Sequence, residues 1–141
     1  MALSVSRVDV WAAGVMDQPG ALAAKLAALS TAGANLEFVI ARRESTTPGT
    51  GVVFVTPING AAQVKAAKAA GFAKTTSLHS VRAGGPDKPG QGARITAALG
   101  DAGINLRGLS AAAIGKTFVA HLALDTAADA AKAIKILKKL P

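Results

Sequence analysis

The sequence repeats itself at a fixed spacing of seventy residues, and this repeat limits what the chain can fold into. Asp17-Gln18-Pro19-Gly20 recurs as Asp87-Lys88-Pro89-Gly90, and Gly33-Ala34-Asn35-Leu36 recurs as Gly103-Ile104-Asn105-Leu106. Both motifs recur at the same spacing, which chance similarity explains poorly. Because two copies must share 141 residues, we expect two small domains of one fold, residues 1–76 and residues 77–141.

Each copy has the pattern strand, helix, strand, strand, helix, with a fourth strand clear only in the first copy. Alternating or β-branched apolar runs predict strands, and helical spacing between turn residues predicts helices. In the first copy we predict strands at residues 7–12, 36–42, 52–56 and 72–76, and helices at 19–32 and 61–70. In the second copy we predict strands at 78–82, 106–114 and 118–124, and helices at 89–102 and 126–137.

The helix ends have recognisable residues. Pro19 and Pro89 suit the first helical position, where the missing N–H costs nothing, and Gly33 and Gly103 suit a left-handed helix stop. The second copy ends directly after its last helix, so its fourth strand is absent or reduced to a residue or two. An open sheet edge is normally covered by another element or chain, which favours pairing of the two domains and a dimer.

Composition restricts the class of protein. Half of the residues are apolar, which is enough for a buried core, and no apolar run approaches the roughly 20 residues that span a bilayer. The N-terminus lacks the features of a secretory signal, so we expect a cytoplasmic protein without membrane association. The chain has no cysteine, which excludes disulfides, thiolate nucleophiles and zinc–thiolate sites.

The net charge of +8 makes nucleic acid a rival partner. The excess is concentrated in residues 71–141, and four of its lysines follow helical spacing, as on a solvated helix face: Lys132, Lys135, Lys138 and Lys139. RNA-recognition motifs share the order of strands and helices, but they stack bases on aromatic side chains. The predicted middle strands offer only Phe38, Phe54 and Phe118. Nucleic-acid binding is therefore the less favoured alternative.

Residues for catalysis or metal binding are not arranged in any recognisable pattern. His79 and His121 each stand without a second ligand at metal-binding spacing, and no pair of carboxylates lies beside a histidine. Ile114-Gly115-Lys116-Thr117 resembles the end of a phosphate-binding loop, but Ser110 stands where that loop needs its first glycine, so a hairpin turn is expected. We predict no catalytic residue, no metal and no cofactor.

The order of elements, with Asp-X-Pro-Gly opening the first helix and Gly-X-Asn-Leu following it, resembles the ACT domain over nearly the whole chain. The closest likeness is to small bacterial proteins made of two ACT domains. The resemblance implies an α+β structure of two tandem ferredoxin-like βαββαβ domains, the second lacking most of its last strand. It also implies side-by-side sheets and an amino-acid effector between domains. The sequence departs from the family at Lys25 and Gly92, where an aliphatic residue is common.

In amino-acid-binding ACT domains, the effector contacts the turn before the first helix and the asparagine after it. The resemblance implies these ligand-binding residues here: Asp17, Gln18, Pro19, Gly20, Asn35, Asp87, Lys88, Pro89, Gly90 and Asn105. Independently of the family, a helix N-terminus attracts a carboxylate, an aspartate attracts an ammonium group, and an asparagine can donate and accept.

We therefore expect a non-catalytic regulatory module that binds an amino acid, forms a homodimer and acts on a separate metabolic enzyme. Ligand occupancy would change the association of domains or subunits. Two alternatives stay open. The chain could be a structural dimerisation module, or a regulatory subunit without a ligand, because Asp-X-Pro-Gly is also an ordinary turn and helix start.

Overall fold

The computed structural model describes residues 2–141 and divides the chain into two compact units. We call Asp9–Thr75 the middle unit, and Met1–Val8 together with Thr76–Pro141 the split unit. The predicted division into residues 1–76 and 77–141 differs from this one at the N-terminus. Residues 4–8 pair with the second copy of the repeat, although they precede the first copy in the sequence.

The middle unit is one antiparallel sheet with two helices. Its elements are β2 (Trp11–Met16), α1 (Ala21–Thr31), β3 (Phe38–Arg43), β4 (Thr50–Thr56), α2 (Gly60–Ala69) and β5 (Ala73–Lys74). The strand order is β3-β4-β2-β5, so the first and third strands of the repeat lie at the centre. The last strand is short, because β5 pairs only with Trp11 and Ala12 of β2.

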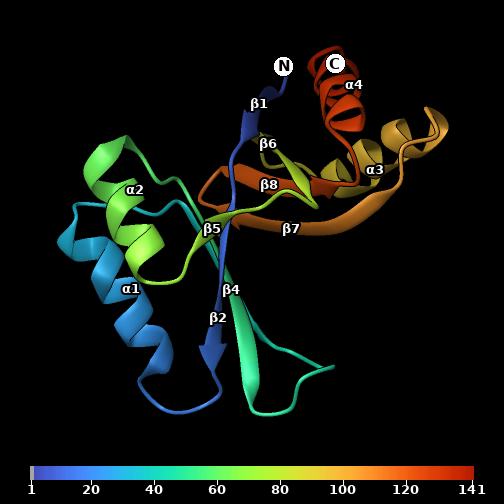
Figure 1. The fold of residues 1–141 in the computed structure, drawn as a ribbon. Coiled ribbons are helices and arrows are strands. Elements are labelled where there is room, and N and C mark those ends of the chain that lie inside the picture. Colours follow the sequence, from blue (N-terminus) through green and yellow to red (C-terminus); the bar gives the residue numbers. More distant parts are fainter. Residues whose placement is uncertain (1) are drawn as a thin grey trace. The chain divides into compact units, whose positions relative to one another are not determined.

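The split unit has the same topology, with one strand taken from the other end of the chain. Its elements are β1 (Ser4–Val8), β6 (His79–Pro86), α3 (Gln91–Asp101), β7 (Leu106–Ile114), β8 (Thr117–Leu124) and α4 (Ala127–Lys138). The order β1-β6-β8-β7 places β1 where the middle unit has β5. In Figure 1 the blue β1 lies beside β6, whereas the rest of this unit is coloured yellow to red.

Within residues 2–141 no strand follows α4, as predicted, but the edge of β6 is not open as expected. All five residues of β1 pair with β6, from Ser4 opposite Gly84 to Val8 opposite Ser80. Two apolar side chains of this segment, Leu3 and Val5, are buried in the core of the split unit. Residues 2–8 therefore supply the strand that does not follow α4.

Each unit has its own hydrophobic core. The buried core of the middle unit consists of Trp11, Ala13, Leu29, Val53, Val55, Ala67 and Phe72. The buried core of the split unit comes from the N-terminal segment, β6, β8 and both helices, with Ile95, Leu99 and Leu137 at most 1% exposed, and Leu106 of β7 packs against it half-buried. Both cores fill the space between one face of a sheet and two helices, as alternation along the strands requires.

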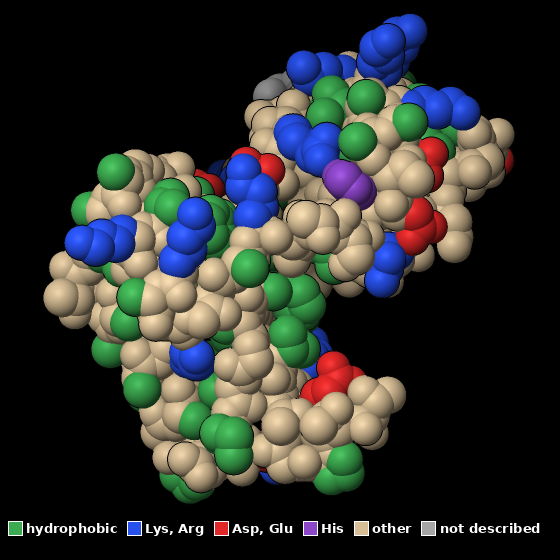
Figure 2. Space-filling view, in the orientation of Figure 1, with side chains coloured by type: hydrophobic (Ala, Val, Ile, Leu, Met, Phe, Trp, Pro, Cys, Tyr) green, Lys and Arg blue, Asp and Glu red, His purple; other side chains and the backbone are tan. Residues whose placement is uncertain are grey.

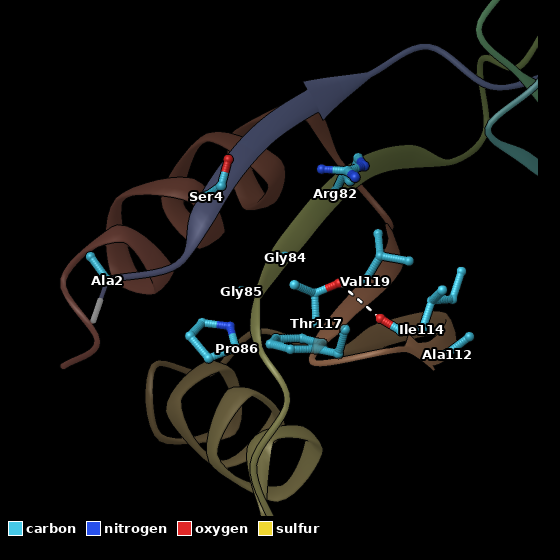
Figure 3. Close-up of a pocket in the computed structure, with 11 residues that line it drawn as sticks. Ala2, Ser4, Arg82, Gly84, Gly85, Pro86, Ala112, Ile114, Thr117 and Val119 are labelled. Atoms are coloured by element: carbon cyan, nitrogen blue, oxygen red, sulfur yellow. Dashed lines mark hydrogen bonds between the residues drawn. The ribbon is translucent and has the colours of Figure 1, made fainter.

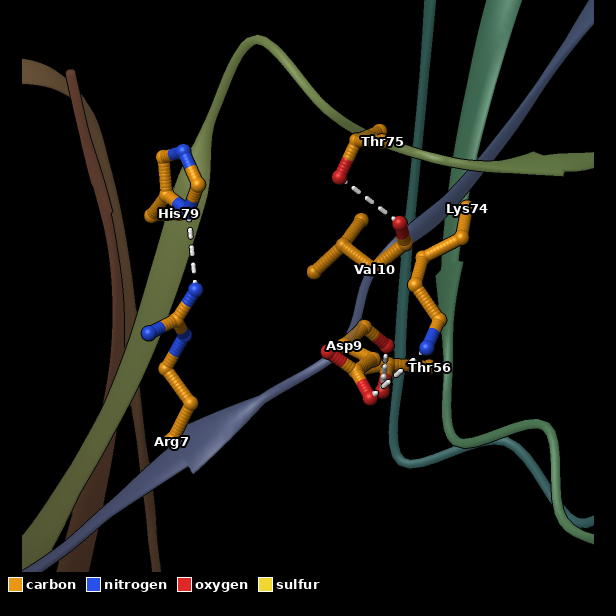
Figure 4. Close-up of polar contacts among 7 residues, drawn as sticks. All are labelled: Arg7, Asp9, Val10, Thr56, Lys74, Thr75 and His79. Carbon is orange, nitrogen blue, oxygen red and sulfur yellow. Dashed lines mark hydrogen bonds and ion pairs between the residues drawn. The ribbon is translucent and has the colours of Figure 1, made fainter. Parts of the chain in front are cut away.

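The strand predicted at residues 7–12 is wrong, because the chain passes from one sheet to the other there. β1 ends at Val8 and β2 begins at Trp11. The two connecting residues are hydrogen-bonded to the middle unit through their backbone carbonyls (Figure 4). The Thr56 hydroxyl donates to the Asp9 carbonyl at 2.8 Å. The amide and the hydroxyl of Thr75 both donate to the Val10 carbonyl.

On the other side of this connection, Arg7 is fixed within the split unit. Its guanidinium lies 2.8 Å from Nδ1 of the His79 ring, at the start of β6 (Figure 4). An ion pair of 3.4 Å joins Lys74 to Asp9 in the middle unit. Both ends of the two-residue connection are therefore anchored.

The helix starts differ from the prediction by two residues. Neither Pro19 nor Pro89 is the first helical residue, because Gly20 and Gly90 follow them as N-caps with φ of +85°. That left-handed conformation suits glycine, so the prolines lie in the turn itself. Gly33 and Gly103 end the helices at φ of +88° and +75°, which confirms the predicted left-handed stops.

The last helix has a side-chain cap at its N-terminus. The Thr126 side chain accepts a hydrogen bond from the Asp129 amide at 3.0 Å. We expect Thr126→Ala to lower the free energy of unfolding by about 1 kcal/mol, because a helical N–H loses its acceptor. Asn59 is a matched control, because it is the N-cap of α2 and its side chain makes no cap hydrogen bond. Urea denaturation that shows equal losses for Thr126→Ala and Asn59→Ala would contradict this assignment.

The length and composition of the helices bear on membrane insertion. Within residues 2–141, none of them is both long and apolar enough to cross a bilayer.

Candidate functional site

The second Asp-X-Pro-Gly turn borders a cavity. The turn joins β6 to α3, and the Asp87 amide donates to the Lys116 carbonyl in the hairpin between β7 and β8 at 2.9 Å. The cavity has a volume of about 230 Å³ and is lined by Pro86, Lys88, Pro89, Gly90, Gln91, Arg94 and Pro141. Three of the four predicted residues of this turn therefore line one small cavity, together with the first turn of α3.

Two side chains that the sequence did not single out shape this cavity. Gln91 is 8% exposed; its Nε2 donates to the Pro86 carbonyl at 2.8 Å, and its Oε1 accepts from Arg94 at 2.7 Å. Arg94 also donates to the Pro141 carbonyl. The buried amide thus holds a guanidinium at the positive end of a helix, an arrangement that favours an anionic group.

A signal for this pair existed in the repeat. At the seventy-residue offset, Gln91 and Arg94 correspond to Ala21 and Ala24. Shared residues of a repeat indicate the common fold, whereas polar residues present in one copy alone indicate a property of that copy. The residues that differ between the copies would have pointed to this cavity.

The first turn has a different environment. Asp17 forms an ion pair of 2.9 Å with Arg43 on β3, and its amide donates to the Gly49 carbonyl at 3.0 Å. A cavity of about 200 Å³ lies beside the turn, lined by Val15, Met16, Asp17, Gln18, Leu22, Ala41, Arg42, Arg43 and Gly51. Because the carboxylate of Asp17 already has a cationic partner, it is less available to an ammonium group than the sequence suggested.

The two asparagines lie at the far ends of the helices from the turns. Asn35 and Asn105 are exposed and follow α1 and α3, whereas the turns precede these helices. Each helix has 11 residues, so at 1.5 Å per residue the asparagine is about 16 Å from the turn of its own unit. A free amino acid cannot contact both within one unit. In each unit the predicted turn residues therefore lie together, whereas the predicted asparagine lies at the opposite end of the helix.

A larger hollow lies on the face of the split unit's sheet that its helices leave open. It has a volume of about 500 Å³, and its lining includes Arg82, Gly84, Ala112, Ile114 and Val119. Figure 3 shows these residues on β6, β7 and β8, with Ala2 and Ser4 along the N-terminal segment. Arg82 is its only charged residue. The hollow is mainly apolar and open, and none of the predicted ligand-binding residues lines it.

The basic excess lies mostly in the split unit. This unit has ten lysines and arginines against four aspartates, whereas the middle unit has six basic and four acidic residues. Basic side chains clearly outnumber acidic ones on the face shown in Figure 2. Of the three phenylalanines considered for base stacking, Phe118 is 9% exposed and belongs to the core. In residues 2–141, no three His, Asp or Glu side chains gather as metal ligands.

Comparisons with known proteins agree with this architecture. Residues 79–141 match the family model of the ACT domain. A crystal structure of a protein from Bacteroides thetaiotaomicron is similar to this chain, with a TM-score of 0.77 and 16% identity over 96% of this chain and 99% of that one. No curated protein was found to match the sequence.

Two aspartate kinase structures are also similar. The regulatory subunit of aspartate kinase from Thermus thermophilus, in its ligand-free form, has a TM-score of 0.65 and 16% identity over 97% of this chain and 95% of that one. Aspartokinase III from E. coli, in complex with aspartate and ADP, has a TM-score of 0.59 and 14% identity, and this chain covers 32% of it. At these identities the likeness shows the fold.

Proposed function

We propose that this chain, whose residues 79–141 match the family model of the ACT domain, is a non-catalytic regulatory module that binds an amino acid. The ligand binds at the turn of residues 87–90. The single observation that carries the proposal is the cavity of about 230 Å³ there, in which buried Gln91 holds Arg94 beside the start of α3. Its volume is large enough for one free amino acid.

The cavity suits both charged groups of a zwitterion. The first N–H groups of α3 and the Arg94 guanidinium attract the α-carboxylate. Asp87 does not line the cavity itself but stands between two lining residues, Pro86 and Lys88, and we assign its carboxylate to the α-ammonium group. Lys88 adds a second cation to the lining. Two cations beside one helix N-terminus favour an amino acid with a second carboxylate, so we expect aspartate and glutamate to bind more tightly than uncharged amino acids.

The regulatory output passes to another protein. The structural neighbour from Thermus thermophilus is the regulatory subunit of aspartate kinase, and a module of this fold without catalytic residues would act in the same manner on a separate metabolic enzyme. We place the asparagine contact on a second copy of the chain, because α3 separates Asn105 from the turn of its own unit. Ligand binding then favours the homodimer over the monomer, which is the differential affinity that regulation requires.

Removal of the guanidinium should abolish most of the binding. We expect Arg94→Ala to weaken the affinity for aspartate at least tenfold, because a hydrogen bond to a charged group contributes about 1.5–3 kcal/mol. Calorimetric titration with each of the twenty amino acids gives the affinity and the preference. Lys135→Ala is the matched control, because it removes one positive charge from the exposed face of α4, outside the cavity.

Three outcomes separate this proposal from its rivals. Absence of heat with all twenty amino acids, while the protein is dimeric by sedimentation, would support the structural dimerisation module. Equal affinities for Arg94→Ala and Lys135→Ala would place the ligand elsewhere. An electrophoretic shift with RNA that disappears at physiological salt would indicate only weak, non-specific attraction by the basic surface.

A further inference from the structure

The first strand of the middle unit has an edge that its own sheet does not cover. β2 extends from Trp11 to Met16, but β5 pairs with only its first two residues. In the split unit, the corresponding edge of β6 is paired over five residues by β1. Within residues 2–141, no strand lies opposite Gly14 or Met16 on this side. The edge of β6 is therefore paired over five residues, whereas the equivalent edge of β2 is paired over only two.

The backbone groups of this edge point outward. In antiparallel pairs, alternate residues direct their N–H and C=O groups to opposite neighbours. The Thr75 amide donates to the Val10 carbonyl on the β5 side, whereas the Asp17 amide donates to Gly49 on the β4 side. Even-numbered residues of β2 therefore face the β5 side. The Met16 carbonyl accepts from the Gln18 amide at 2.9 Å, so both groups of Gly14 and the N–H of Met16 remain at the edge.

A hollow lies beside these groups. It has a volume of about 480 Å³ and is lined by Gly14, Val15, Met16, Ala21, Lys25, Thr50 and Gly51. Met16 is 59% exposed, and a Cβ added at Gly14 would meet no atom within 4 Å. The Lys25 ammonium donates to the Ala70 carbonyl at 2.5 Å, so this lysine, a departure from the family pattern, caps α2 instead of entering the core.

The split unit shows which side chain fits such a place. There Leu3, one residue before β1, is 5% exposed, and a Cβ on Gly85 would come within 3.1 Å of its side chain. Gly85 pairs with Phe118, as Val15 pairs with Gly51 in the middle unit. In the split unit, the Leu3 side chain therefore occupies the space beside Gly85. At the equivalent position beside Val15, the middle unit has a hollow.

We propose that the edge of β2 at residues 13–16 binds an extended segment of a partner protein, antiparallel to β2, with an aliphatic side chain in the hollow. The backbone groups of Gly14 and Met16 would bind the segment, as in other cases of strand addition. A second copy of this chain is the less favoured occupant, because each copy carries a net charge of +8 and the hollow includes a lysine. A segment with acidic residues complements that charge.

The test uses a probe peptide and two variants of the whole protein. The probe is a synthetic peptide of residues 2–8 carrying Arg7→Glu, with blocked ends. Gly14→Pro removes the outward N–H and no hydrogen bond to β4, so the sheet tolerates it as an edge proline. Gly14→Ala keeps the N–H and is the matched control. We expect calorimetry to show affinity at least tenfold weaker for Gly14→Pro, and within about twofold of the unchanged protein for Gly14→Ala.

The remaining outcomes each decide the proposal. Binding to Gly14→Pro at unchanged affinity would mean that the peptide replaces β1 in the split unit, and would overturn the proposal. A dimer that Gly14→Pro dissociates would identify a second copy as the occupant and would also overturn it. A peptide that additionally carries Leu3→Asp must lose its affinity for the unchanged protein; equal binding contradicts the proposal even if Gly14→Pro fails to fold.

Discussion

Deletion of residues 2–8 will unfold the split unit while the middle unit remains folded. The deletion removes the ladder between β1 and β6 and two buried side chains, Leu3 and Val5. It also exposes Val81 and Ala83, which are fully buried on β6. Burial of each aliphatic side chain contributes roughly 1.5–3 kcal/mol, and domains this small have a total stability near 5 kcal/mol. The free energy lost with the strand therefore exceeds the free energy of unfolding of the split unit.

Two signals follow the two units separately in this experiment. Trp11 is the only tryptophan in the chain and is 5% exposed in the core of the middle unit, so its fluorescence reports on that unit. Far-UV circular dichroism reports on the secondary structure of the whole chain, so a partial loss of its signal with unchanged Trp11 fluorescence indicates unfolding of residues 76–141, and the positions of protease cleavage locate it. The exposed Ser4 and Ser6 provide the control, since replacing either with alanine should change stability by less than about 0.5 kcal/mol. A protease-resistant split unit in the deletion variant would contradict the assignment of β1.

Leu29→Ala and Leu99→Ala will each destabilise one unit by about 3–5 kcal/mol. The two leucines are equivalent in the repeat, and both have an exposed fraction of 0%. Leu29 belongs to the core of the middle unit and Leu99 to that of the split unit. Each replacement removes three buried carbon atoms and leaves a cavity that the neighbouring side chains only partly fill.

The measurement distinguishes two cores from one. In urea, Leu29→Ala should shift the transition followed by Trp11 fluorescence, whereas Leu99→Ala should leave that transition nearly unchanged. The double variant should show the sum of the two losses, because changes in separate cores are additive. A shift of the Trp11 transition by Leu99→Ala that equals the shift by Leu29→Ala would show that the units unfold as one.

The fold could be predicted because the repeat shows which turns, helix ends and strands the two copies have in common. The turn before each helix, the glycine after it and the strand order all recur at one spacing, and local chemistry explains each of them. Residues 106–114 were predicted as a strand and form β7 with the same bounds. Gly103, three residues before the start of that strand, takes the predicted left-handed conformation. Such features depend on neighbours in the sequence, so a sequence reveals them.

The partner of the N-terminal strand was not predicted, because tertiary pairing decides it. Residues 4–16 are rich in small and β-branched residues, and apart from Asp9 and Gly14 they contain no Asp, Asn, Gly or Pro. The sequence pattern typical of a strand therefore extends over β1, β2 and the two residues that connect them. The offset of seventy nevertheless contained the answer: it aligns β6 with residues 9–16, so that residues 2–8 have no counterpart in the second copy.

The candidate site was predicted only in part, for a geometric reason. Sequence motifs place Asp87 and Asn105 near the two ends of one helix, and a resemblance to a family names both as ligand contacts. The length of α3 then separates them. Gln91 was missed because glutamine is common on helix surfaces, and only the structure shows it buried between Pro86 and Arg94.

The contribution of residues 2–8 to a sheet completed by residues 79–124 has a consequence for synthesis on the ribosome. β1 must wait for β6, which is translated roughly 70 residues later, and at 5–20 residues per second this takes on the order of 4–14 s. Meanwhile, residues 9–75 can complete their own core. The nascent chain therefore carries an unpaired, partly apolar leading strand ahead of a finished domain, and chaperones that recognise extended apolar segments have that interval in which to bind it.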